Sequence, residues 1–168
     1  AHAPPPDRSA DFRSRLAAEI GPLEFGVPGT AGTEEPGEKG APGNAAGGPP
    51  GPGAKRYAEF YGFPDFTRRA GVFHRMGVLE DRAPSLGVQY FVPRGRRKGT
   101  VFLAHGYLDH TGPLRPIIEA AAEAGFSVAA YDLPGHGFSG GPRGDIGCFA
   151  EYGLAAGRVV EAFRRGTE

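Results

Sequence analysis

The stretch GTVFLAHGYLDHTGPLRPIIEAAAEAGFSVAAYDLPGHGFSGG, residues 99–141, contains two apolar runs separated by a helical pattern. The runs are GTVFLA (99–104) and FSVAAYD (126–132), and runs of this kind are typical of strands covered on both faces. Between them, LRPIIEAAAEAG predicts a helix, with Pro116 in its first turn and Gly125 as its stop. A strand, a helix and a strand in about 33 residues predict two parallel strands joined by a right-handed crossover.

The glycine-rich end of this stretch, PGHGFSGG (134–141), matches the serine-hydrolase elbow G-x-S-x-G from Gly137 onward. A nucleophile elbow needs a strand directly before its serine and a helix directly after it. The predicted strand ends at Asp132, seven residues before Ser139, and no helix start follows before about Asp145. The spacing therefore disfavours Ser139 as a nucleophile.

The same loop, read from Gly135, spells the dinucleotide fingerprint G-x-G-x-x-G. That fingerprint needs an acidic residue at the end of the next strand, whereas Glu161, which has the spacing, falls in a predicted helix. Asp132 would also place a negative charge near the pyrophosphate. A dinucleotide-binding protein remains a minor alternative.

The sequence on either side of residues 99–141 predicts further elements of the same domain. RAGVFHRMGVLED (69–81) and GVQYFVPRG (87–95) predict an antiparallel strand pair, in which His74 is an ordinary strand histidine rather than a ligand. CFAEYGLAAGRVVEAF (148–163) predicts a helix. Its apolar stripe, expected to face a sheet, comprises Phe149, Tyr152, Ala156, Val159 and Phe163.

The first third of the chain has a different composition. SADFRSRLAAEI (9–20) predicts a short amphipathic helix, and the following glycine- and proline-rich residues have too few large apolar side chains to form a core. We therefore expect an N-terminal segment at 1–25, a disordered linker at 26–54 and a partial α/β domain at 55–168.

Charge and cysteine content exclude several function classes. Nineteen basic residues balance nineteen acidic ones, and the short basic run Arg94–Lys98 predicts a solvated turn, so no nucleic-acid partner is expected. The single cysteine, Cys148, excludes an intrachain disulfide and predicts a small buried hydrophobic residue. We expect no cofactor, no metal and no transmembrane segment, with a cytoplasmic setting as the default.

Two segments carry a family resemblance: TVFLAHGYLDHTG (100–112) and YDLPGHGFSGG (131–141). They resemble the motifs H-G-x-x-[ED]-H-[ST]-G and D-x-x-G-H-G-x-S-x-G of the α/β-hydrolase superfamily, within its monoacylglycerol lipase, lysophospholipase and serine aminopeptidase group. The resemblance covers about residues 69–163. It implies the N-terminal part of an α/β-hydrolase fold: a mostly parallel sheet whose first strands are antiparallel, with helices on both faces.

The resemblance also implies roles for individual residues. The Tyr107 backbone N–H would help to bind the oxyanion of a tetrahedral intermediate. The oxyanion loop would be supported by His105, Gly106 and His110, and a tight loop beside the site would comprise Asp132, Gly135, His136, Gly137 and Ser139.

In the family, the nucleophilic serine, the acid and the catalytic histidine follow later strands. None of these positions occurs in the 168 residues, so we expect the N-terminal portion of a serine hydrolase acting on monoacylglycerol or lysophospholipid esters, inactive alone. Residues 99–104 would then form an open edge that favours self-association. The alternative is a non-catalytic binding or scaffold protein on a degenerate hydrolase fold.

Overall fold

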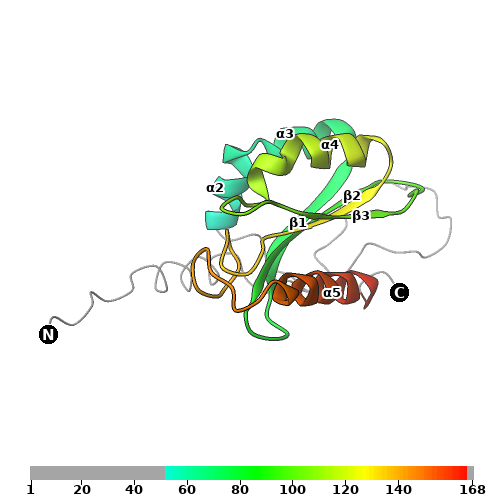
Figure 1. Cartoon of the computed structure of the whole chain (residues 1–168). Coiled ribbons are helices and arrows are strands. Elements are labelled where there is room, and N and C mark those ends of the chain that lie inside the picture. Colours follow the sequence, from blue (N-terminus) through cyan, green and yellow to red (C-terminus); the bar gives the residue numbers. More distant parts are fainter. Residues whose placement is uncertain (1–51, 166–168) are drawn as a thin grey trace, which may run out of the picture.

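The computed structural model describes residues 52–165, which form a four-stranded sheet with helices on both faces (Figure 1). In chain order the elements are α2 (Pro52–Phe60), α3 (Phe63–Ala70), β1 (Val72–Leu79), β2 (Leu86–Pro93), β3 (Thr100–Ala104), η1 (Gly112–Leu114), α4 (Arg115–Glu123), β4 (Ser127–Tyr131) and α5 (Ala150–Arg165). Helices α2, α3 and α4 lie on one side of the sheet, and α5 lies on the other. The predicted α/β class is confirmed.

The N-terminal predictions lie largely outside the described residues. The helix expected at 9–20 and the linker expected at 26–54 precede them, except that Pro52, Gly53 and Ala54 already belong to α2. Helical structure therefore begins three residues before the boundary expected at Lys55. The division into three segments stays a prediction.

The strands lie in the order β1-β2-β4-β3. β1 and β2 pair antiparallel from Val72↔Pro93 to Leu79↔Leu86, and β3 and β4 pair parallel, as predicted. β2 pairs antiparallel with β4. Because β3 and β4 run the same way, the loops that follow them emerge at one edge of the sheet.

Alternation along the central strands divides the core between the two faces. On β4, Val128 and Ala130 face the cluster under α3 and α4, whereas Ala129 and Tyr131 face the cluster under α5. All five residues of β4 are buried. This pattern confirms β4 as a strand covered on both faces.

The same expectation for residues 99–104 is wrong. β3 is an edge strand of the described sheet; its Ala104 is exposed, and its Phe102 is 39% exposed although the ring contacts Phe163 of α5. An apolar run alone does not distinguish an edge strand from a central one, because both bury at least one face. Self-association through this edge stays a prediction.

The predicted stripe of the last helix is only partly correct. Val159 and Phe163 are buried against the sheet, but Phe149 precedes the helix and is 84% exposed. Arg158 takes a buried position that a purely apolar pattern does not anticipate. Cys148, which precedes Phe149, is exposed, so its predicted burial is also wrong.

Candidate functional site

The candidate site lies where the loop after β3 meets the loop after β4. Residues 105–112 and 132–141 follow two parallel neighbouring strands and are joined by side-chain hydrogen bonds to backbone groups. Every site residue predicted from the sequence belongs to one of these two loops. The structure therefore brings the predicted residues together.

Two histidines act as acceptors for backbone N–H groups across the two loops. His105 Nε2 accepts from Leu133 N at 2.9 Å, and His136 Nε2 accepts from Leu108 N at 3.2 Å. His105 Nδ1 donates to Gly106 O at 2.7 Å, and His136 Nδ1 donates to Pro134 O at 2.9 Å. Both imidazoles are thus neutral Nδ1–H tautomers in this arrangement, with no free nitrogen for a general base.

Asp132 joins the two loops through a fully buried carboxylate. Its Oδ1 accepts from Thr111 N at 2.8 Å and from Thr111 Oγ1 at 2.7 Å, while its Oδ2 accepts from Phe138 N at 2.8 Å. Its nearest histidine nitrogen, His105 Nε2, is 4.0 Å away and carries no proton to donate. Backbone and hydroxyl donors, rather than a cation, therefore stabilise the carboxylate.

Ser139 is buried in the glycine-rich loop. Its hydroxyl donates to the Asp132 carbonyl oxygen and accepts from Gly87 N at 2.9 Å. No imidazole or carboxylate side chain bonds to this hydroxyl among residues 52–165. The geometry makes Ser139 a link between the glycine-rich loop and β2.

The glycine-rich loop also lacks the geometry of a dinucleotide site. A Rossmann loop runs directly into a helix whose N-terminus binds the pyrophosphate. Here α5 begins only at Ala150, ten residues after Gly140. Instead the loop turns back on itself, with Gly135 N bonded to Gly140 O at 2.7 Å and Gly144 N to Gly135 O at 3.0 Å.

Two glycines are required by the closeness of the packing. Gly137 has φ +45°, and a Cβ there would overlap the Asp132 carboxylate. A Cβ at Gly112 would overlap the Tyr61 ring. Both loops therefore pack too tightly at these points to accept a side chain.

Tyr107 and Leu108 lie at the exposed turn of the first loop. Their side chains are 69% and 74% exposed, and Leu108 has a left-handed backbone with φ +60°. Whereas Leu108 N bonds to His136, no hydrogen bond to the Tyr107 N–H is found within the part of the chain that the structure describes. The Tyr107 hydroxyl donates to Gly144 O at 3.1 Å.

His110 connects the first loop to the start of the domain rather than to the second loop. Its Nε2 lies 2.6 Å from the Tyr61 hydroxyl, and the two rings meet edge to face at 5.5 Å. His110 N donates to Asp109 Oδ1 at 2.8 Å. His110 therefore supports the loop by hydrogen bonding, but from a different side than His105 and His136.

Arg158 builds a second polar cluster on the α5 side. Its guanidinium donates to Asp81 Oδ1 at 2.6 and 3.2 Å, to Pro84 O at 2.7 Å and to Arg82 O at 2.7 Å. Burial opposes ionisation of Asp81, but the hydrogen bonds and charge of Arg158 outweigh it and lower the pKa of that carboxyl. The cluster ties α5 to the turn between β1 and β2.

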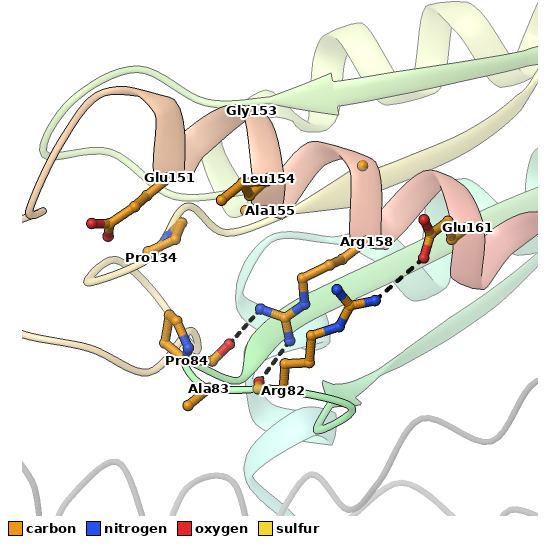
Figure 2. Close-up of a pocket in the computed structure, with 11 residues that line it drawn as sticks. Arg82, Ala83, Pro84, Pro134, Glu151, Gly153, Leu154, Ala155, Arg158 and Glu161 are labelled. Carbon is orange, nitrogen blue, oxygen red and sulfur yellow. Dashed lines mark hydrogen bonds and ion pairs between the residues drawn. The ribbon is translucent and has the colours of Figure 1, made fainter.

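A groove of about 400 Å³ lies between α5 and this turn (Figure 2). Arg158 points from α5 toward Pro84 and Arg82, and Arg82 also reaches Glu161 at 3.5 Å. The groove is lined by no histidine, serine or cysteine, and its only contribution from the two site loops is Pro134. Its titratable side chains are two arginines and two glutamates, and Glu161 is paired with Arg82, so the candidate site stays with the two loops.

Protonation of His74 and His105 should make the stability of the fold depend on pH. Burial lowers the pKa of His74 to about 4 and also lowers that of His105. In the unfolded chain both protonate at about pH 6.5, so between about 6.5 and 4 the unfolded state binds more protons. The free energy of unfolding should therefore decrease as the pH falls through this window, by up to about 1.4 kcal/mol per pH unit for each histidine.

His74→Gln tests this pH dependence. His74 Nε2 donates to Gln89 Oε1 at 3.1 Å, a bond that a glutamine amide can replace. Urea unfolding at several pH values between 6.5 and 4.5 should give a shallower decrease for the variant than for the natural chain. An unchanged slope would show that His74 does not contribute. Carboxylates titrate mainly below this range and leave the comparison clear.

Several residues of the site were not identified from the sequence. They are Thr111, which bonds twice to Asp132, Tyr61, which bonds to His110, and Gly87, which bonds to Ser139. The motif D-H-T-G marks Thr111, but Tyr61 and Gly87 contact residues 49 and 52 positions away and carry no local signal. Only the folded arrangement places them at the site.

Residues 52–165 also bear on metal binding and membrane crossing. No cluster of His, Cys, Asp and Glu side chains there has an arrangement that could hold a metal ion. No helix of that part has both the length and the apolar character needed to cross a bilayer.

Part of this chain is similar to known proteins. Residues 95–167 match the family of serine aminopeptidases, S33. A monoacylglycerol lipase of Mycolicibacterium smegmatis is 40% identical over 67 residues, which are 40% of this chain and 21% of the relative. An uncharacterized abhydrolase domain-containing protein of Dictyostelium discoideum is 35% identical over 67 residues, or 40% of this chain and 7% of that protein. The chain thus matches about a fifth of the length of the first of these relatives and less of the second.

Two solved structures have a similar arrangement. A hypothetical protein from Pseudomonas aeruginosa gives a TM-score of 0.48 with 22% identity, covering 55% of this chain and 30% of that one. An esterase from Pyrococcus furiosus gives a TM-score of 0.45 with 23% identity, covering 60% of this chain and 41% of that one. These likenesses are weak. The matched residues 95–167 contain both loop motifs, and over this segment the chain is similar to the α/β-hydrolase superfamily.

Proposed function

We propose that residues 52–165 form the oxyanion-binding part of a serine hydrolase that acts on carboxylic esters of the monoacylglycerol or lysophospholipid type. In this proposal the Tyr107 N–H donates to the developing oxyanion, and His105, Gly106 and His110 hold its loop. The nucleophile, the acid and the catalytic histidine are not among residues 52–165, so the 168-residue chain is inactive alone. The similarity to a monoacylglycerol lipase supports the ester class.

One observation supports this proposal most strongly. Four backbone N–H groups and the Thr111 hydroxyl donate to the side chains of His105, His136 and Asp132, yet the Tyr107 N–H has no partner within residues 52–165. A loop held in this way, with an unbonded N–H at an exposed residue, is suited to bind an anion that forms only during reaction, because no reorganisation is needed when the charge develops.

Turnover of p-nitrophenyl butyrate by the purified 168-residue chain tests the inactivity. We expect no hydrolysis above the buffer rate, because the only serine in the glycine-rich loop donates its proton to a backbone carbonyl oxygen rather than to a base. Hydrolysis by the chain that Ser139→Ala abolishes would instead identify Ser139 as a nucleophile and overturn the proposal.

A chimera tests the positive part. Residues 52–167 would replace the start of the M. smegmatis monoacylglycerol lipase up to the end of the aligned segment, so that the remainder of that lipase follows. We expect the chimera to hydrolyse monoacylglycerol. A chimera that folds, by circular dichroism and cooperative thermal unfolding, but does not hydrolyse the ester would favour the non-catalytic scaffold.

A further inference from the structure

The turn after α2 contacts the candidate oxyanion loop at two points. The Tyr61 hydroxyl lies 2.6 Å from His110 Nε2, and the Tyr61 ring packs so closely on Gly112 that no Cβ could fit there. These two contacts lie near the C-terminal end of residues 105–112, whereas Leu108, in the middle of the loop, bonds to His136 of the second site loop. The loop is therefore held between the second site loop and the residues that precede β1.

α2 also contacts the glycine-rich loop, through Tyr57. The Tyr57 ring meets Phe138 edge to face at 4.7 Å, and its hydroxyl accepts from Gln89 Nε2 at 3.2 Å. Burial raises the pKa of Tyr57 well above its ordinary value, so the hydroxyl stays protonated. Because the Phe138 N–H is itself bonded to Asp132, this contact reaches the carboxylate that joins the two loops.

These contacts come from a part of the chain that the family match does not include. The match begins at residue 95, whereas Tyr57 and Tyr61 precede the first strand of the sheet. The motifs of the two loops therefore do not account for either tyrosine. Residues outside the matched segment therefore contact both loops of the site.

We infer that Tyr61 is a positioning residue that acts through His110 to hold the turn at Tyr107. Tyr57 supports the neighbouring glycine-rich loop in the same way. The catalytic significance of this positioning role rests on the proposed function, in which the Tyr107 N–H binds an oxyanion. The physical link from Tyr61 to the loop, however, can be measured without any catalysis.

Amide hydrogen exchange in the ¹⁵N-labelled 168-residue chain tests this link. Tyr61→Phe keeps the ring beside Gly112 and removes only the hydroxyl. Loss of a hydrogen bond worth about 1 kcal/mol predicts roughly 5-fold faster amide exchange at Asp109 and Thr111. The Asp109 amide donates to Gly106 O within the loop, and the Thr111 amide donates to Asp132 Oδ1. Exchange at Val128 and Ala130 in the central strand β4 should not change.

Tyr152→Phe is the matched control, because Tyr152 belongs to α5, which lies on the face of the sheet opposite α2 and α3. It should leave exchange at Asp109 and Thr111 unchanged. Equal acceleration of all amides by Tyr61→Phe would indicate general destabilisation and overturn the inference, as would unchanged exchange in the loop. In a His110→Ala background, Tyr61→Phe should have no further effect on the loop amides; an undiminished effect there also overturns it.

This outcome is separable from that of the proposed function. An active chimera with no exchange effect of Tyr61→Phe would remove the positioning role and leave the oxyanion role intact. If Tyr61→Phe accelerates exchange in the loop but the chimera is inactive, the physical link from Tyr61 to the loop stands and its proposed role in catalysis does not.

Discussion

Replacing Asp132 with Asn is expected to lower the free energy of unfolding by about 2–4 kcal/mol. The carboxylate accepts three hydrogen bonds, from Thr111 N and Oγ1 on one oxygen and from Phe138 N on the other. An amide offers only one acceptor oxygen, so its NH₂ group must face a buried donor on one side. The expected loss therefore comes from an unpaired backbone N–H rather than from a change in size.

Urea unfolding monitored by circular dichroism measures this loss. Asp145→Asn is the matched control, because Asp145 also accepts a backbone N–H, from Ile146 at 2.8 Å, but in an exposed loop. The control should change the free energy of unfolding by less than about 0.5 kcal/mol. A change at Asp132 no larger than that of the control would mean that the carboxylate does not hold the two loops together.

Removing the Tyr107 N–H is expected to lower kcat of the active chimera by about 10²–10³-fold. The residue can be replaced by its α-hydroxy acid analogue, so that an ester oxygen stands where the N–H was while the side chain stays. Within residues 52–165 this N–H has no partner to lose, so the folded state should be little affected. The effect is specific to the reaction because the oxyanion exists only in the transition state and intermediate.

Tyr107→Ala separates the backbone from the side chain. It keeps the N–H and removes an exposed ring whose hydroxyl bonds only to Gly144 O. We expect kcat for this variant to stay within about 10-fold of the parent chimera, well short of the loss for a missing oxyanion donor. Equal losses for the two variants would assign the effect to the ring and contradict the backbone role.

The fold was largely predictable from local patterns. The strands β1, β2 and β4 and the helix α4 follow from apolar periodicity bounded by glycine and proline, and Gly125 ends its helix with φ +89° as expected. What periodicity could not supply was position within the sheet. GTVFLA is as apolar as a central strand, yet β3 has a neighbour on only one side among the described strands.

The candidate site was predictable only where a motif names its residues. The two loops were placed beside each other because they follow parallel neighbouring strands. Tyr61 and Arg158 were missed for a common reason: each is a polar or aromatic side chain whose partners lie 49 to 77 residues away in sequence. Local patterns count Arg158 as a solvated charge and Tyr61 as ordinary packing.

The hydrogen bonds between the two loops have a consequence for the chain entropy of folding. Leu133 to His105 and Leu108 to His136 each close a span of 28 residues, whereas the bond from Arg158 to Asp81 closes 77. By the logarithmic cost of loop closure, the shorter span is cheaper by about 0.9 kcal/mol. The loops of the candidate site can therefore be joined within a single strand-helix-strand unit, without help from the contact that fastens α5 to the far turn of the sheet.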